Sequence, residues 1–203
     1  QGLKYTIVDM SQNGNLGRVT SKNIYLNTVK TTEQITAIKH CNNKDHWVIV
    51  KGFVTNRYYI VPVTSAGVGT PLQQNIGQVH PNTGPNAGSN ENTIGTMRAS
   101  AQGDNLAINY RIERGIELFD FDNSTGQLSN PRYWRNRSWG LPYGREFSPS
   151  GQYLYCSMIG AWDIYQFDIT LPSSAAILGS AYQVSDDTRG GNIQIASDGK
   201  IYK

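Results

Sequence analysis

The residues between positions 132 and 143 carry the side chains best suited to binding chemistry. The segment contains Arg132, Tyr133, Trp134, Arg135, Arg137, Trp139 and Tyr143. Guanidinium groups pair with carboxylate and sulfate groups, and an exposed indole stacks on a sugar ring or packs against a partner's side chain. The candidate ligand-binding residues are therefore Trp134, Arg135, Arg137, Trp139 and Tyr143.

Three interpretations of this segment stay open. The two Trp side chains can fill space between layers of the fold while the arginines are solvated. The segment can instead contact a protein, because Trp, Tyr and Arg are the usual anchors of protein interfaces. It can also bind an anionic glycan or another anion. Four further basic residues, Lys51, Arg57, Arg111 and Arg114, lie in or next to predicted connections between strands and are expected on the same face.

Composition narrows the choice of partner. Charged residues make up 16% of the 203 residues and the net charge is +3, which permits an anionic partner without requiring one. The motifs of the common nucleic-acid modules are absent, so we expect no nucleic-acid partner. No apolar run approaches the roughly 18 residues that span a bilayer, so we expect no direct membrane insertion. No signal peptide precedes the first predicted strand, which suggests an interior or processed piece of a longer protein.

Carboxylates are the candidates for catalysis. Asp120, Asp122, Asp163 and Asp168 could supply the pair of carboxyl groups that glycoside hydrolysis needs. They recur, however, near the ends of equivalent predicted strands. Repetition favours a structural role, in which each carboxylate accepts hydrogen bonds from the backbone of the turn that follows. We therefore expect no catalytic residues.

The sequence also predicts no metal ion and no cofactor. His40, His46 and His80 have no Cys or carboxylate at metal-ligand spacing. The pair at 186–187 lacks the alternating Asp/Asn pattern of a calcium loop. No Gly-x-Ser-x-Gly nucleophile elbow is present. Cys41 and Cys156 lie in or beside predicted strands two repeats apart, so both are expected to be buried free thiols beyond disulfide reach.

The elements that position these residues are indicated by an internal repeat. An apolar segment, a polar turn with glycine and a second apolar segment occur three times, with Gly103, Gly151 and Gly199 spaced by 48 residues. A second phrase at 117–122 recurs at 163–168 and so follows nearly the same period. One such unit of hairpins cannot bury both of its own faces. A period near 50 is therefore typical of the blades of a β-propeller.

The predicted fold class is all-β, a β-propeller fragment of about four four-stranded blades. A composition with 21 Gly and abundant β-branched and aromatic residues supports it. The blade ranges predicted are 1–34 (partial), 35–93, 94–141, 142–190 and 191–203 (partial). Since a propeller must close on itself, we expect further blades outside this sequence, in a ring of as many as seven.

Each blade is expected to contain strands a to d, counted from the axis outward. The short glycine turns join a to b and c to d at one end of the blade. The longer connections lie at the opposite end, where we expect binding residues. For the blade at 35–93 the predicted strands are 35–41, 46–51, 57–64 and 73–79. For the blade at 94–141 they are 94–100, 105–110, 116–122 and 127–134. In the blade at 142–190, strands c and d are predicted at 162–169 and 176–184.

Several segments carry a resemblance that spans nearly the whole chain. Residues 3–10, 36–41, 117–123, 143–149 and 164–168 resemble the WD40-like propeller of large secreted surface proteins of gliding-type bacteria. The resemblance implies a secreted or bacterial cell-surface location, export by the type IX secretion system, and neighbouring PKD-like repeats with a C-terminal sorting domain. The family has no settled catalytic residues, so none are carried over.

The expected function is that of a non-enzymatic binding, display or assembly scaffold. Its partner would be a protein or other chains of a surface assembly. The alternative is a glycan-binding module, or a polysaccharide-active hydrolase or lyase with its site at the propeller axis. Carboxylates about 5–10 Å apart near that axis would favour the enzyme. On the scaffold hypothesis, Trp139→Ala weakens partner capture without unfolding the chain.

Overall fold

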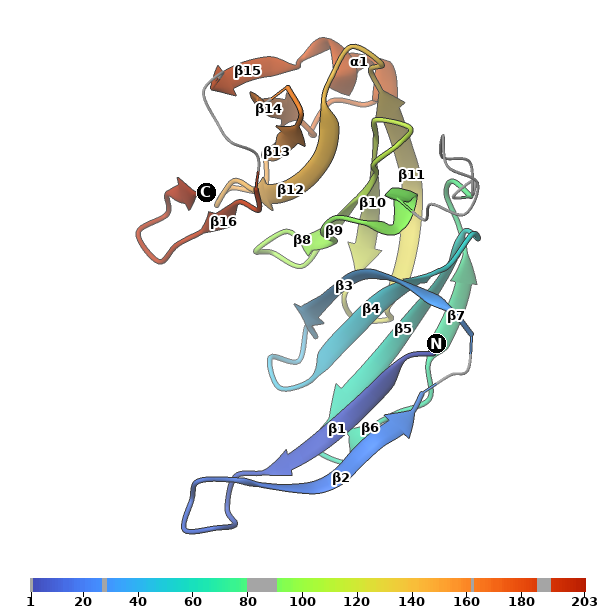
Figure 1. The fold of residues 1–203 in the computed structure, drawn as a ribbon, viewed down its shortest axis with the longest axis vertical. Coiled ribbons are helices and arrows are strands. Elements are labelled where there is room, and N and C mark those ends of the chain that lie inside the picture. Colours follow the sequence, from blue (N-terminus) through green and yellow to red (C-terminus); the bar gives the residue numbers. More distant parts are fainter. Residues whose placement is uncertain (1, 27–28, 80–90, 162, 186–190) are drawn as a thin grey trace. The chain divides into compact units, whose positions relative to one another are not determined.

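The structure is a computed structural model of the chain, and it describes residues 2–26, 29–79, 91–161, 163–185 and 191–203. The chain divides into two compact units, Gln1–Thr31 and Thr32–Lys203. Antiparallel strands dominate both units (Figure 1). The all-β fold class predicted from the sequence is therefore confirmed.

The first unit is a two-stranded hairpin. Strand β1 (Lys4–Asp9) pairs with β2 (Arg18–Tyr25), with Lys4 opposite Tyr25 and Asp9 opposite Arg18. For this partial blade the sequence predicts a strand at 3–10 and an outer strand with its exit at 15–29; β1 confirms the first, and β2 is shorter than the second at both ends. Ordered turn residues occupy part of the difference, since Gly17 N–H donates to the carbonyl oxygen of Gln12 at 3.2 Å.

The second unit contains three larger sheets and a short final hairpin. In the first sheet β3, β4 and β5 are neighbours in that order, and both β6 and β7 pair with β5. The bounds are β3 (Thr31–Lys39), β4 (His46–Gly52), β5 (Arg57–Thr64), β6 (Gly67–Val68) and β7 (Leu72–Asn75). The four strands predicted here are confirmed in place, although β7 ends at Asn75 rather than at residue 79.

The next two sheets are four-stranded meanders, with each strand paired to its neighbour in sequence. Strands of the second sheet are β8 (Arg98–Ala99), β9 (Asn105–Tyr110), β10 (Gly115–Asp122) and β11 (Gln127–Arg135), and a 3-10 turn, η1 (Glu91–Thr93), precedes them. Strands of the third are β12 (Leu141–Phe147), β13 (Tyr153–Ile159), β14 (Asp163–Asp168) and β15 (Tyr182–Ser185). The final hairpin is β16 (Gln194–Ile195) with β17 (Ile201–Tyr202).

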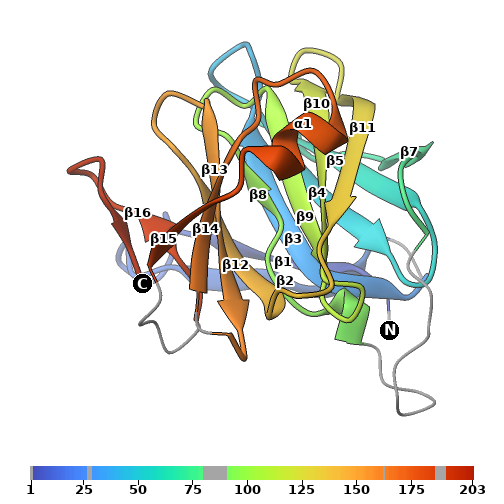
Figure 2. The same cartoon turned by 90° about the horizontal axis from the view of Figure 1, so that it is seen from above.

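The outer strand predicted at 176–184 is wrong in its first half. Residues Ser174–Gly179 form a short helix, α1, and β15 begins only at Tyr182. The Ser173 hydroxyl accepts a hydrogen bond from the Ala176 N–H at 3.2 Å, which caps the first turn. Ile177 is buried, and α1 contacts β11 (Figure 2). No helix among the described residues is long and apolar enough to cross a bilayer.

The glycines of the repeat adopt one conformation. Gly103, Gly151 and Gly199 have φ of 72°, 74° and 76°, in the left-handed region that side chains other than glycine rarely adopt. Each N–H donates to the carbonyl oxygen three residues earlier, at 3.0, 2.9 and 3.0 Å. The three turns are therefore structurally equivalent, and the repeat read from their spacing is confirmed.

A fourth copy of this turn lies in the first sheet. Asn43 has φ of 60°, and its N–H donates to the His40 carbonyl oxygen at 2.9 Å. Asn tolerates the left-handed region better than most residues, so it replaces glycine here. Cys41 falls inside this turn and is exposed, which corrects the expectation of two buried thiols; Cys156 is buried, and both are free.

The second sheet is buried on both of its faces. Leu106, Ile108 and Tyr110 of β9 belong to a core shared with the first sheet, whereas Ala107 between them belongs to a core shared with the third sheet. In β10, Phe119 and Phe121 face the first sheet, while Ile116 and Leu118 face the third. This alternation is the period-two pattern of a strand buried on both sides. Face-to-face stacking of successive sheets follows from it (Figure 2).

The core predicts a large effect for Phe119→Ala. Phe119 is fully buried, and its ring packs edge-on against Tyr58 of the first sheet with centroids 5.3 Å apart. We expect the free energy of unfolding to fall by about 3–5 kcal/mol, as for other buried aromatic residues. Chemical denaturation measures it, with exposed Ser129→Ala as a control that should change stability by less than about 0.5 kcal/mol. Equal losses in the two variants would contradict the stacked arrangement.

Candidate functional site

An arginine-lined pocket lies at one end of the second sheet. Its walls come from the turn between β9 and β10, which supplies Ile112, Glu113 and Arg114, and from the end of β11 and the connection after it, which supply Arg135 and Arg137. The hollow has a volume of about 410 Å³. Three guanidinium groups thus line it with one carboxylate. The structure brings together two of the candidate residues, Arg135 and Arg137, with one expected neighbour, Arg114.

Arg114 is held in an unusual backbone conformation. Its φ is 53°, in the left-handed region that few residues other than glycine adopt. Such a conformation costs roughly 1–3 kcal/mol unless the surroundings compensate for it. The Nη1 group donates hydrogen bonds to the carbonyl oxygens of Arg137 and Trp139. These bonds fix the guanidinium in the pocket wall and hold residues 137–139 in place.

Glu113 is the acidic member of the pocket. Its Oε2 accepts a hydrogen bond from the Tyr133 hydroxyl at 3.4 Å and lies 3.9 Å from Nη1 of Arg135. Burial, together with the Glu113 charge, raises the pKa of Tyr133 to about 12. The Arg135 side chain is 46% exposed. Because so long and solvated an ion pair contributes little, Arg135 can pair with an incoming anion at small cost.

Trp134 and Trp139 fill space between two sheets, which is the first of the three interpretations of this segment, and neither is available as an exposed ligand-binding residue. They are 3% and 5% exposed and belong to the core between the second and third sheets. Trp134 lies against Phe167 at 5.6 Å, and Trp139 contacts both Tyr165 and Phe167 at 5.2 and 5.3 Å. Residue 134 lies in β11, within the strand predicted at 127–134, and its register opposite Ile116 directs it inward. Trp139→Ala should therefore cost about 3–5 kcal/mol of stability.

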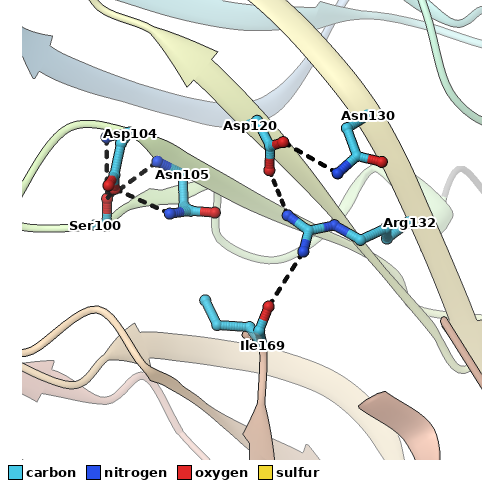
Figure 3. A network of polar contacts seen from close by, with 7 residues as sticks. All are labelled: Ser100, Asp104, Asn105, Asp120, Asn130, Arg132 and Ile169. Carbon is cyan, nitrogen blue, oxygen red and sulfur yellow. Dashed lines mark hydrogen bonds and ion pairs between the residues drawn. The ribbon is translucent and has the colours of Figure 1, made fainter. Parts of the chain in front are cut away.

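Arg132 ties two sheets together instead of lining the pocket. It lies within β11, where its Nη2 pairs with Asp120 of β10 and its Nη1 donates to the Ile169 carbonyl oxygen at 3.1 Å (Figure 3). Asn130 donates to the other oxygen of Asp120 at 3.0 Å. The Arg132 side chain is 12% exposed. The strand predicted at 127–134 is thus confirmed and extends to Arg135, so the segment 132–139, which the sequence also suggested as an irregular connection, is strand over its first four residues.

The other expected members of the site lie elsewhere. Tyr143 is half-buried in β12, does not line the pocket, and its carbonyl oxygen accepts a hydrogen bond from the backbone at residue 96. Arg57 donates to a side chain of β7 at 3.1 Å. Arg111 lies 3.9 Å from a carboxylate of η1. Lys51 is buried. Of the four basic residues expected on this face, Arg114 is the one that lines the pocket.

Lys51 belongs to a buried polar cluster that the sequence did not reveal. Its side chain is 0% exposed, and Nζ donates to the Tyr110 hydroxyl and the Gln78 carbonyl oxygen, both at 2.7 Å. The Tyr110 hydroxyl donates in turn to Glu117, which also accepts from the Gln78 N–H at 2.9 Å. Burial lowers the pKa of Lys51 to about 7 and raises the pKa of Glu117.

This Lys51–Tyr110–Glu117 cluster is connected to the wall of the arginine-lined pocket through Tyr133. The Tyr110 ring packs edge-on against Tyr133, with centroids 5.6 Å apart. Tyr133 in turn donates to Glu113 in the pocket wall. Tyr110 is also the last residue of β9, directly before the turn that carries the wall. The cluster therefore fixes both the start of the turn and the aromatic ring beneath it.

The carboxylates considered for catalysis have structural partners. Asp122 and Asp168 each accept two hydrogen bonds from the residue two positions later, one from its N–H and one from its hydroxyl. For Asp122 these bonds are 2.9 and 2.6 Å long, and for Asp168 they are 3.0 and 2.6 Å long. These bonds lower the pKa of both, that of Asp122 to about 2. Asp9 of the first unit repeats the arrangement. Asp163 accepts a hydrogen bond from Gln183 at 2.9 Å. The turn-capping interpretation is confirmed for Asp122 and Asp168.

Histidines do not form a metal site where the structure describes them. His40 Nδ1 accepts a hydrogen bond from the Asn42 N–H at 3.1 Å, and the ring stacks on Trp47 at 5.4 Å. Among the described ranges, no three His, Cys, Asp or Glu side chains gather so as to hold a metal ion. His80 and the pair at 186–187 lie outside the described residues.

The pKa of Lys51 predicts a pH dependence of stability. The lysine loses its proton near pH 7 in the folded chain and near pH 10.5 when unfolded. Between these values the unfolded chain binds more protons, so the free energy of unfolding rises with pH. Glu117, whose pKa burial raises, contributes in the opposite direction while it titrates, so the contribution of Lys51 is read from the difference between wild type and a Lys51 variant. Lys51→Met should abolish this rise.

Chemical denaturation at several pH values measures the effect. Lys44→Met, which removes an exposed lysine, is the matched control and should keep the rise. The buried Tyr58 and Tyr110, whose pKa values burial raises, stay protonated in the folded chain throughout this range. The same slope in wild type and Lys51→Met would show that Lys51 is not the titrating group.

Comparisons with known proteins show the fold alone. No family model matches the sequence. No curated protein matches it either. The structure is similar to a protein from Lactobacillus plantarum, with 12% identity, a TM-score of 0.59, and coverage of 90% of this chain and 50% of that one. It is also similar to the Myceliophteria thermophila Cps50 (Swd1) β-propeller domain, with 14% identity and a TM-score of 0.56. That comparison covers 94% of this chain and 56% of that one.

A streptogramin B lyase structure is similar as well, at 15% identity and a TM-score of 0.52, with 97% of this chain and 60% of that one covered. The chain spans about half to three fifths of the length of these structures. It is a β-propeller fragment, as the repeat predicted. The comparisons support the propeller part of the resemblance to bacterial surface proteins, and none of them supports type IX secretion or gliding bacteria.

Proposed function

We propose that this propeller segment is a non-enzymatic scaffold that binds a protein partner through a carboxylate placed in the arginine-lined pocket. The observation that carries the proposal is the convergence of Arg114, Arg135 and Arg137 on one hollow. Arginine recognises carboxylates in planar, paired hydrogen bonds. The burial of both Trp side chains removes the rings that would stack on a sugar. The absence of an exposed Trp ring among the described residues of the pocket favours a protein partner over a glycan.

A non-enzymatic role is supported by the bonding of the acidic side chains. Asp122 and Asp168 are committed to turn capping, and Asp120 to Arg132. Propellers host many unrelated functions, and the similar structures include one named as a lyase, so the fold itself does not decide between a scaffold and an enzyme. The proposal includes a secreted or cell-surface location, which rests on the resemblance of the sequence.

The double variant Arg135→Gln/Arg137→Gln tests the pocket. A fluorescein-labelled hexaglutamate peptide serves as the probe, and fluorescence anisotropy measures its dissociation constant. Because a hydrogen bond to a charged group contributes about 1.5–3 kcal/mol, we expect at least a tenfold loss of affinity. Affinity for the wild type should also fall as salt rises, since the arginines are exposed.

The matched control is Arg18→Gln/Arg57→Gln, which removes the same charge from residues outside the pocket. Its affinity should stay within about threefold of wild type, because neither side chain lines the pocket and charges that do not touch the ligand are largely screened by salt. Equal losses of affinity in both double variants would show that net charge alone explains the binding, which would refute the site. Binding of a heparin hexasaccharide without binding of the peptide would transfer the site to sulfated glycans.

A further inference from the structure

A second hollow adjoins the arginine-lined pocket. It has a volume of about 400 Å³ and shares Arg114 with the first. Its remaining wall comes from the connection into β12 and from the end of β13. The side chains that line it are Trp139, Leu141, Ile159 and Ala161, with Ser138 and two glycines. We refer to it as the Trp139 hollow.

Its lining differs in chemistry from that of the first pocket. Leu141, Ile159 and Ala161 are half-buried aliphatic side chains, and the Trp139 indole lies beneath them as part of the core. Gly140 lets the connection into β12 lie directly against the end of β13, because a Cβ there would lie 2.5 Å from the Ile159 carbonyl oxygen. A ligand group that fits this place is apolar, since burial of aliphatic surface gains free energy and burial of a polar group costs it.

The two hollows have a fixed spatial relation. The Arg114 guanidinium donates to the carbonyl oxygen of Arg137, beside the first pocket, and to that of Trp139, beside the second. The short connection between them is itself ordered, since the Trp139 N–H donates to the Asn136 carbonyl oxygen at 3.2 Å and the Ser138 N–H to the Asn136 side chain at 2.9 Å. A ligand can therefore engage both hollows at a constant separation.

We infer that the partner presents a peptide segment in which an acidic residue is followed closely by an apolar residue. The carboxylate occupies the arginine-lined pocket, and the apolar side chain occupies the Trp139 hollow. This inference rests on the proposed function and specifies the partner's sequence. Charge complementarity selects the acidic residue, and the aliphatic lining of the second hollow selects its neighbour. A sulfated glycan has no group that matches the aliphatic lining.

Four fluorescein-labelled peptides test the inference. They share one polar framework and differ at two positions, which hold Glu and Leu, Glu and Asn, Gln and Leu, or Gln and Asn, each made with none, one or two residues in between. Anisotropy titrations give the dissociation constants. At the best spacing we expect Glu/Leu to bind wild type at least tenfold more tightly than either Glu/Asn or Gln/Leu.

Variants assign the apolar contribution to the Trp139 hollow. Ala161→Leu fills it and should reduce the preference for Glu/Leu over Glu/Asn to less than about threefold. Ala175→Leu, at an exposed position of α1, is the matched control and should keep the preference. Thermal unfolding shows whether each variant folds. If Ala161→Leu does not, Leu141→Ala replaces it, since it removes aliphatic contact surface from the same hollow.

The outcomes separate this inference from the proposed function. If Glu/Leu and Glu/Asn bind equally and Arg137→Gln weakens both, the pocket binds acids but the second hollow has no role, and the inference is overturned alone. If no Glu peptide binds, both proposals fail. If Gln/Leu binds as tightly as Glu/Leu, the contact is purely apolar, and the acidic half of the inference is refuted. Loss of the Glu/Leu preference in Ala175→Leu would also overturn it.

Discussion

Both faces of the β8–β11 sheet lie against another sheet, and this double burial decides where its charged side chains can go. A charge in the middle of β9 or β10 would meet aliphatic and aromatic side chains on either side. Lys51 and Glu117 enter the interior near strand ends, where the Tyr110 hydroxyl and backbone groups of Gln78 satisfy them. Arg114, Arg135 and Arg137 lie at or beyond strand ends, in the turn between β9 and β10 and at and after the end of β11, where water and a ligand reach them.

The sequence predicted what depends on local conformation. The turns that contain Gly103, Gly151 and Gly199 need φ near 75°, which glycine alone adopts without strain, so the need is visible at one residue. Asp122 and Asp168 cap turns through a residue two positions away, so their role also follows from a short segment. The turn at Asn43 was not predicted, because an asparagine rather than a glycine adopts the positive φ there.

What the sequence could not predict depends on partners far along the chain. Lys51 follows four apolar residues at a strand end, where lysine is normally solvated, and its partner Tyr110 lies 59 residues away. The burial of Trp134 follows from the register of β11 against β10, where Trp134 lies opposite Ile116, and the sequence alone left its exposure open. The arginine-lined pocket combines a tight turn with a strand end about 20 residues later. Only their tertiary arrangement shows that Arg114 and Arg135 share one hollow.

The strained turn at Arg114 connects stability with recognition. A glycine at this position would relieve the backbone, yet it would leave the carbonyl oxygens of Arg137 and Trp139 without their donor. An arginine therefore stabilises the loop that separates the two hollows and presents positive charge to the first of them. Since its guanidinium is ordered before a ligand arrives, less conformational entropy is lost on binding. The packed rings of Tyr110, Tyr133 and Trp139 hold this arrangement rigid. The locally unfavourable backbone at Arg114 therefore persists, because the packing around it allows no other conformation.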